Sequence, residues 1–424
     1  MINYIRYFLL FLGVFAVRIG LSQEVAITDI RAALWEAATD NPTLRGKRAE
    51  MAAAQSDLAA ARWQYWPTPS IGVSRPDKSL IKGGDASTST IMLKQPIWTG
   101  GRIEASVSYA KARSQTTQAT FAEVRRDVVI ETIQAWVEFC SAIARVRVYE
   151  AGVQVHKRFL EQIHRRTNAG LSVQSDNALA GSRLDAMQAD LTNARVAAQS
   201  SAERLRTLTG QTPAPVATLP EALLEDLLAQ TNTEVEIQAA LQIDPGLQRL
   251  TSEIQEIKAQ IDSVKSNYWP DLHVSISQYQ GDVTGKVNQI AFGFESKWGA
   301  GLANASAVQA AVQRLEAKQE EVEYRTRKLT EQVRADQLQL HAAQARVQAY
   351  RQALASANEV ADSWGRQFSA GKKSWQEVMN AARESTQTEI QLVEAISSTA
   401  VIDWRLAVLT RGVDWVLQSS KAQL

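Results

Sequence analysis

The chain has 424 residues, a formal net charge of +1 and a single cysteine, Cys140. The near-zero charge gives no electrostatic basis for binding nucleic acid, and one cysteine excludes an internal disulfide framework. The four histidines and Cys140 match no familiar zinc-ligand spacing, so neither a metal site nor a cofactor is predicted.

Residues 1–22 are expected to form a secretory signal peptide. Arg6 precedes the apolar run YFLLFLGVFAV, and the small residues Gly20 and Ser22 suit a cleavage site after Ser22. An uncleaved membrane anchor is the alternative, although the run is shorter than the ~20 residues that a spanning helix needs. The remaining sequence has no apolar run of that length, so the mature protein is expected to lack a transmembrane helix.

The two halves of the mature chain share landmarks in the same order. The dipeptide NP at 41–42 recurs as DP at 244–245, and the tripeptide YWP at 65–67 recurs at 268–270, each 203 residues later. Such a series indicates an internal repeat. We therefore predict two copies of one unit, residues 23–215 and 235–415, with an equatorial linker at 216–234 and a C-terminal tail at 416–424.

Proline placement limits where long helices can lie. All ten prolines lie at or before Pro96, between Pro213 and Pro245, or at Pro270. Since a proline costs a helix interior ~3 kcal/mol, the stretches between them are free to form helices. Apolar and small residues recur there at threes and fours, which is coiled-coil-like spacing. Helices are predicted over 27–65, 99–210, 235–267 and 300–412, the longer regions each being folded back at one turn.

Two β-hairpins are predicted between the helices, at 68–97 and 271–297. Both contain alternating apolar and polar or small residues around loops rich in Gly, Asp and Lys. Strands of ~8–10 residues with one apolar face match the span of an outer-membrane barrel. The alternative is a soluble hairpin packed on helices.

Aromatic residues cluster in the sequence where helices give way to strands. Tyr and Trp favour a membrane–water interface because each combines an apolar ring with a polar group. We therefore predict that these residues form one ring at the base of the strands: Tyr65, Trp66, Trp98, Tyr268, Trp269 and Trp298.

Four strands cannot span a bilayer alone, because their open edges would leave unpaired backbone groups in hydrocarbon. Two copies of the chain would supply eight strands and a barrel filled by side chains, whereas three copies would supply twelve strands and leave a lumen. The expected fold class is therefore mainly α with transmembrane β. Long helices would form a coiled-coil tube joined to a twelve-stranded barrel of a homotrimer.

Several short segments resemble the TolC-like family of outer-membrane efflux and export proteins. They are QPIWTGGR before the long helix, the AGLS turn followed by Asp176, and LRTLTG at the end of the first unit. The resemblance covers nearly the whole mature chain. It implies a passive trimeric conduit, not an enzyme, which spans the outer membrane and periplasm of a Gram-negative bacterium. The implied partners are a periplasmic adaptor, an inner-membrane transporter and outer-membrane lipid.

The resemblance also implies roles for two turns. Ala169, Gly170 and Leu171 in one turn, and Ala370, Gly371 and Lys372 in the other, match periplasmic tips that contact the adaptor. A gate is expected among Ser175, Asp176, Phe368 and Lys373, including a Lys373–Asp176 ion pair. Glu377 matches an inward acidic ring whose next position is Asn380 in this chain. The alternative for Asp176 and Glu377 is that they stabilise helix N-termini.

Three functions remain open. Trp98-Thr99 stands where the family commonly has Leu/Phe-Asp before Gly-Gly, which is similar to the branch that exports large adhesins by type I secretion with an ABC transporter. Protein export is therefore the first prediction. The outer duct of a small-molecule efflux pump and a secreted coiled-coil scaffold without a pore are the alternatives. Cys140 is expected in a buried helix seam, and His156 and His164 on solvated helix faces.

Overall fold

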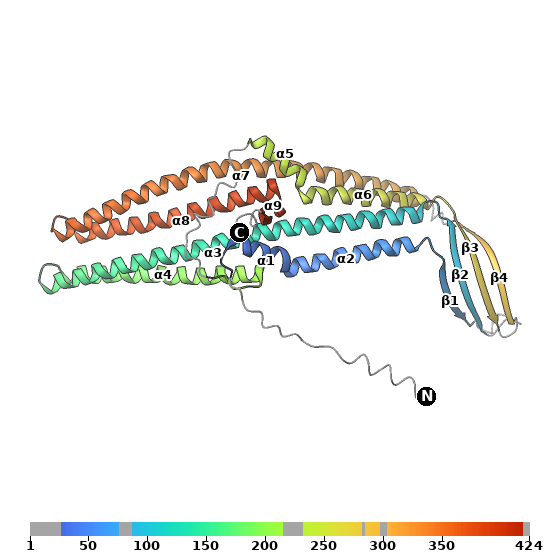
Figure 1. Cartoon of the computed structure of the whole chain (residues 1–424), viewed down its shortest axis with the longest axis horizontal. Coiled ribbons are helices and arrows are strands. Elements are labelled where there is room, and N and C mark those ends of the chain that lie inside the picture. The colour runs from blue at the N-terminus through green and yellow to red at the C-terminus, as the bar shows by residue number, and fades with distance from the viewer. Residues whose placement is uncertain (1–26, 76–86, 215–231, 282–284, 297–302, 419–424) are drawn as a thin grey trace, which may run out of the picture.

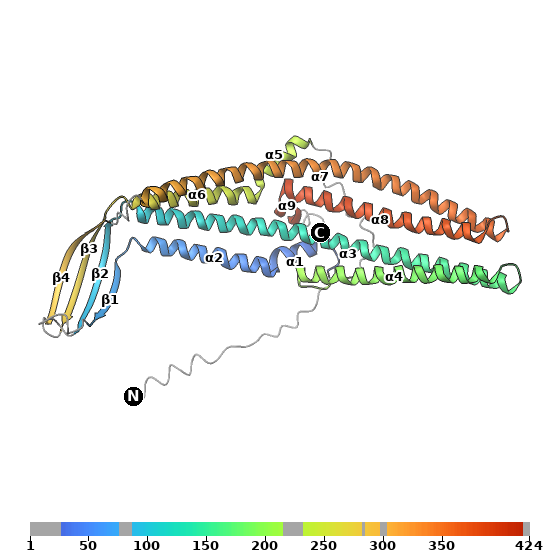
Figure 2. The same ribbon diagram turned by 180° about the vertical axis from the view of Figure 1, so that it is seen from behind.

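The computed structural model describes residues 27–75, 87–214, 232–281, 285–296 and 303–418. The molecule is elongated, with a sheet at one end and two long helical hairpins lying side by side at the other (Figures 1 and 2). The predicted signal peptide, residues 216–231 of the predicted linker, and Trp298 lie outside the described residues.

The elements of the two halves follow the same order. The first half contains α1 (Ile30–Asp40), α2 (Pro42–Trp63), β1 (Thr68–Ser74), β2 (Thr88–Trp98), α3 (Arg102–Asn168) and α4 (Gln174–Thr209). The second contains α5 (Thr233–Ile243), α6 (Pro245–Ser266), β3 (Asp271–Gly281), β4 (Gly285–Glu295), α7 (Ala303–Ser369) and α8 (Trp375–Arg411). The four helices of each half have nearly equal lengths, 11, 22, 67 and 36 residues against 11, 22, 67 and 37.

The stretches predicted as helix over 27–65 and 235–267 are each two helices. Asn41 separates α1 from α2, and its side chain accepts a hydrogen bond from the backbone N–H of Thr43. Asp244 separates α5 from α6 and accepts from Leu247 in the same way. Proline follows both residues as the first residue of the next helix, where its missing N–H costs nothing. The NP and DP dipeptides are therefore helix breaks that also act as N-caps.

The main hydrophobic core lies midway along the molecule, where α1, α3, α4, α8 and α9 (Val413–Gln418) meet. Trp136, Phe139 and Cys140 of α3 are buried in it, and burial raises the pKa of the Cys140 thiol to about 12. The tail predicted from 416 onward begins inside α9, where Val416 and Leu417 are buried. This short helix covers the end of α8 with an apolar face that was not predicted from the sequence.

The helical hairpins pack through the predicted seams. On α4 the buried residues Leu184, Met187 and Leu191 pack against Val153 of α3. Within the part of the chain that the structure describes, no helix is both long enough and apolar enough to cross a membrane.

The strands form one antiparallel sheet in the order β1-β2-β3-β4. The two predicted hairpins are thus joined edge to edge through β2 and β3, whose register runs from Thr88–Gly281 to Trp98–Leu272 with an irregularity after Pro96. Among the described residues, β1 and β4 each have one edge that no strand covers.

Candidate functional site

Both hairpin turns at the helical end have the same backbone conformation. Gly170 and Gly371 have φ values of 73° and 72°, a left-handed conformation that favours glycine. The N–H of Leu171 donates to the carbonyl of Arg166, and that of Lys372 donates to the carbonyl of Gln367. The predicted adaptor-contact residues Ala169–Leu171 and Ala370–Lys372 therefore form two matching, exposed tips.

The turn between α7 and α8 is held by an additional capping box. Ser374 accepts from the N–H of Glu377, and the Glu377 carboxylate accepts from the N–H of Ser374. Lys373 donates to the same carboxylate at 2.7 Å, and its Nζ lies 4.3 Å from the Trp364 ring centroid. Hydrogen bonds from Lys373 and Ser374 lower the pKa of Glu377 to about 2.

Within one chain, Lys373 has a partner other than the expected Asp176, and a Lys373–Asp176 pair between subunits stays a prediction. Among the described residues, Lys373 pairs with Glu377 and not with Asp176. The reason is local: Glu377 lies one turn from Lys373 on the same chain segment, so little entropy is lost on pairing. Glu377 thus stabilises the N-terminus of α8, and its place in an inward acidic ring stays a prediction. Asp176 lies in the first turn of α4, while Ser175 and Asn380 are exposed.

An apolar cluster joins the two hairpins just behind their tips. Phe368 of α7 is only 4% exposed and packs with Ile163 of α3, Ala180 of α4 and Trp375 of α8. The guanidinium of Arg166, on α3, lies over the Phe368 ring at 5.0 Å. Phe368, predicted as a gate residue, therefore links the hairpins through a buried ring and a cation–π contact.

His156, which was predicted to lie on a solvated helix face, is buried. His156 lies in α3 one turn from Gly152, which packs against Met187 of α4, and its Nδ1 is 2.9 Å from the Gly152 carbonyl oxygen. Burial lowers the pKa of His156, and the charge of Arg183 lowers it further, while the Gly152 hydrogen bond opposes both. His164 is exposed, as predicted.

The sheet at the opposite end has two chemically different faces. One face carries apolar residues that pair across strands and are exposed in the single chain: Ile71, Ile91, Leu93, Leu272, Ile276, Ile290, Phe292 and Phe294. The other face carries serine, threonine and glycine, together with a Lys94–Glu295 ion pair of 3.9 Å. An exposed apolar face of this size is typical of a surface that contacts a membrane or another protein.

The predicted interface aromatics lie where helices and sheet meet. Tyr65 and Trp66 follow α2, Tyr268 and Trp269 follow α6, and Trp98 is the last residue of β2. The Trp98 and Trp269 rings make an edge contact with centroids 6.0 Å apart. Trp63 was not predicted to belong to this group, yet its ring lies 6.1 Å from that of Trp66.

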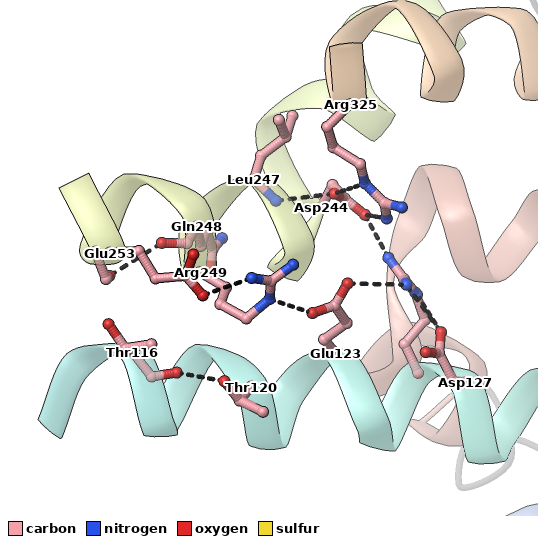
Figure 3. A network of polar contacts seen from close by, with 12 residues as sticks. Thr116, Thr120, Glu123, Asp127, Asp244, Leu247, Gln248, Arg249, Glu253 and Arg325 are labelled. Atoms are coloured by element: carbon pink, nitrogen blue, oxygen red, sulfur yellow. Dashed lines mark hydrogen bonds and ion pairs between the residues drawn. The ribbon is translucent and has the colours of Figure 1, made fainter. Parts of the chain in front are cut away.

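A buried network of charges near the α5–α6 break was also missed (Figure 3). The Asp244 carboxylate accepts two hydrogen bonds from Arg325 of α7, at 3.0 and 3.1 Å, and one from Arg126 of α3. The side chain of Asp244 is 2% exposed and that of Arg126 is 9% exposed. Burial alone would lower the pKa of Arg325, but the hydrogen bonds and charge of Asp244 raise it.

The network continues along α6. Glu123 of α3 accepts from Arg249 at 2.7 Å, and Arg249 donates in turn to Glu253 at 2.6 Å. Lys318 of α7 pairs with Glu253 at 3.0 Å. Opposite charges therefore alternate across α3, α6 and α7. A side chain at Gly246 would lie 2.8 Å from the Glu123 carboxylate, so glycine allows this close approach. The one sign of this network in the sequence is that Asp244 replaces, in the second half, the neutral Asn41 that precedes proline in the first.

Comparisons with known proteins agree with this architecture. The family model for outer membrane efflux proteins matches residues 33–211 and 237–410. The cobalt-zinc-cadmium resistance protein CzcC of Cupriavidus metallidurans is 24% identical over 373 residues, covering 87% of each chain. The outer membrane protein TolC of Salmonella enteritidis is 23% identical over 387 residues, covering 85% of this chain and 77% of TolC.

The crystal structure of CusC, which forms a transmembrane channel, has the same fold with a TM-score of 0.78 at 14% identity. The alignment covers 92% of this chain and 95% of CusC. Since the family match takes in most of both halves, this chain belongs to the outer membrane efflux protein family, and it resides in the outer membrane of a Gram-negative bacterium and extends into the periplasm.

Proposed function

We propose that three copies of this chain form a passive duct, the outer component of a tripartite export machine. The observation that carries this proposal is the four-stranded sheet with one apolar face and two open edges. Such edges are unstable in hydrocarbon unless they are paired, and three sheets would close into a twelve-stranded barrel that leaves a lumen. The small and polar residues of the opposite face would line that lumen.

The long helices support the periplasmic part of the duct. A helix of 67 residues spans about 100 Å, far more than a bilayer needs. In the proposed assembly, the helices of three chains pack into a tube below the barrel. The recurring helix lengths support the interpretation of the chain as two copies of one unit, so that three chains would supply six similar units around the axis.

The matching tips are proposed to contact a periplasmic adaptor, which in turn binds an inner-membrane transporter. Behind them, a groove of about 820 Å³ lies among α3, α7 and α8 and includes the small residues Ala361 and Gly365 of α7. Small residues allow a helix of a partner to approach closely. We further propose that the apolar cluster around Phe368 keeps the tips of each subunit together in the resting state. The gate roles of Ser175, Asp176, Lys373, Glu377 and Asn380 stay predictions.

Two classes of cargo have support. Similarity to CzcC extends over 87% of the chain and favours efflux of small solutes, metal cations included. Trp98-Thr99 before Gly100-Gly101 favours export of a large adhesin by type I secretion. Because the first similarity involves most of the chain and the second only two residues, efflux of small solutes is the function that we propose, with protein export as the second candidate.

The decisive experiment deletes the gene and measures metal sensitivity, drug sensitivity and the secreted and surface proteins of the same strain. A separate test purifies the protein and asks whether it needs detergent to stay soluble. Increased sensitivity to cobalt, zinc, cadmium or drugs, with unchanged secreted proteins, would support efflux. Loss of one very large surface protein, with unchanged sensitivity, would support type I secretion and overturn the efflux proposal. Purified protein that stays soluble without detergent would contradict the duct itself and favour a scaffold.

A further inference from the structure

The two helix-to-sheet junctions share a pattern that the transport function does not explain. Residues 62–67 read RWQYWP and residues 265–270 read KSNYWP. Each segment contains a cation, any residue, a side-chain amide, and then Tyr, Trp and Pro. The pattern therefore places one positive charge three residues before each Tyr-Trp pair.

The two segments also have the same backbone. The amide residues Gln64 and Asn267 are C-caps with nearly equal dihedral angles, φ −62° and ψ −18° against φ −66° and ψ −12°. The N–H of Tyr65 donates to the carbonyl of Arg62, and that of Tyr268 donates to the carbonyl of Lys265. Both junctions are thus built as one tight turn that holds the cation next to the aromatic pair.

The second turn continues the apolar face of the sheet. Trp98 pairs in register with Leu272, and Leu272 pairs with Phe294 on the same face. The Trp269 ring contacts Trp98, so it extends this face toward the helices. Trp66 and Trp269 are 62% and 59% exposed, which leaves both indoles accessible to a membrane.

The charges near the turns divide into paired and unpaired groups. Arg102 is paired with Asp271 at 3.5 Å, and Lys94 is paired with Glu295. Arg62 and Lys265 are exposed, and no ion pair joins either of them to another described residue. Among the residues that the structure describes here, Arg62 and Lys265 are therefore cations available to an external anion.

We propose that these two turns bind the phosphate groups of anionic phospholipids at the membrane surface. Arg62 or Lys265 would contact the phosphate, while the adjoining Tyr and Trp would lie beside the glycerol and the first acyl carbons. Basic residues combine with amphipathic rings in this way because the phosphate and the acyl chain are only a few ångströms apart in the lipid. A duct of three chains would carry six such sites around its circumference.

The test uses the full-length protein in a neutral detergent, with thermal unfolding measured during titration of phosphatidylglycerol, phosphatidylcholine or inorganic phosphate. Phosphatidylglycerol is expected to raise the unfolding midpoint, whereas the other two are not. In the variant Arg62→Gln/Lys265→Gln, phosphatidylglycerol should bind about fivefold more weakly for each cation removed. The swapped variant Arg62→Lys/Lys265→Arg should retain the effect.

The matched control is Lys111→Gln/Lys258→Gln, which removes two exposed lysines from α3 and α6 at positions farther from the sheet. It should respond to phosphatidylglycerol as the unmodified protein does. An equal response in the control and the Arg62/Lys265 variant would overturn the proposal. A response to phosphatidylcholine as large as to phosphatidylglycerol, or a response to inorganic phosphate alone, would overturn it as well.

Discussion

The α1–α2 and α5–α6 breaks have the same backbone and opposite chemistry. Asn41 and Asp244 both precede proline, and both cap the following helix. Asn41 is neutral and donates a hydrogen bond to the carbonyl of Leu208 at 3.0 Å. Asp244 is charged and binds Arg126 and Arg325. Beyond its helix cap, the first break is thus joined to another helix by one neutral hydrogen bond, and the second by a buried ionic network.

The difference shows that a shared backbone can be held by unlike interactions. Burying charges is unfavourable unless their partners are well placed, whereas a neutral amide has a smaller desolvation cost. The buried ionic network should therefore make the stability of the second half more sensitive to loss of one partner. The Asp244 network also joins the α5–α6 break to α3 and α7, whereas Asn41 joins the α1–α2 break to α4 alone.

The largest difference between the halves is expected at these two breaks. Asp244→Ala leaves Arg126 and Arg325 without their carboxylate and should cost about 3–5 kcal/mol of stability. Asn41→Ala removes one cap and should cost about 1–2 kcal/mol. Unfolding by denaturant in detergent measures both. Asp40→Ala, which breaks an exposed pair with Arg45, is the control and should have an effect below ~1 kcal/mol. Equal losses at 41 and 244 would contradict the comparison.

The second comparison is between the tips. Phe368 of the second half corresponds to Thr167 in the first, 201 residues earlier. Phe368→Ala empties the cluster that joins the hairpins and should cost about 3 kcal/mol, whereas Thr167→Ala should cost less than ~1 kcal/mol. If the cluster keeps the duct closed, Phe368→Ala will also raise the resting conductance in planar bilayers, and Thr167→Ala will not.

The same recording distinguishes the two gate hypotheses. An ion pair between Asp176 and Lys373 of different subunits would make Asp176→Asn/Lys373→Gln raise the conductance while Phe368→Ala leaves it unchanged. That result would reject the apolar gate.

The third comparison concerns helix capping. Ser374 caps α8, while Val173, at the equivalent place before α4, provides no side-chain cap. The backbone angles of the two residues are nearly equal: φ −78° and ψ 153° at Ser374, and φ −84° and ψ 155° at Val173. Ser374→Ala should therefore cost about 1 kcal/mol and Val173→Ser should stabilise by a similar amount. Hydrogen exchange at the first turns of α4 and α8 would show both changes, and no gain at Val173→Ser would mean that the backbone match is insufficient.

The smallest effect at neutral pH is expected at His156, whose equivalent in the second half is Ala357. The folded-state pKa of His156 lies below its ordinary value of 6.5, because burial disfavours the charged ring. Its contribution to stability is therefore complete above pH 6.5 and is lost as the pH falls through the folded-state pKa.

His156→Leu should remove this part of the pH dependence, measured as the difference in unfolding free energy between the variant and the unmodified protein from pH 7.5 to 5. Ala357→His places the ring at a half-exposed position and should add little pH dependence. A larger effect at 357 than at 156 would contradict the assignment.

The elements that could be predicted depend on local signals. Prolines marked the ends of the helices, Gly170 and Gly371 marked the tips, and alternation marked the strands. The partners of Asp244 could not be predicted, because Arg126 and Arg325 lie 118 and 81 residues away in sequence and are brought together only by helix packing.

The local partner of Lys373 at the helical tip was missed for a different reason. The expectation of a Lys373–Asp176 pair left out the Glu377 carboxylate, four residues farther along the same segment, with which Lys373 pairs within the chain. The burial of His156 was missed because the charged residues Lys157 and Arg158 follow it directly, while its burial depends on the packing of helices that are distant in sequence.

The uncovered edges of β1 and β4 have a genetic consequence. In the proposed trimer each chain completes the edges of two others, so a defective strand in one chain leaves its normal neighbours unclosed. When normal and defective alleles are expressed equally, only roughly one assembly in eight would contain three normal chains. Mutations at these edges are therefore expected to be dominant, whereas truncations that prevent the chain from reaching the membrane should be recessive.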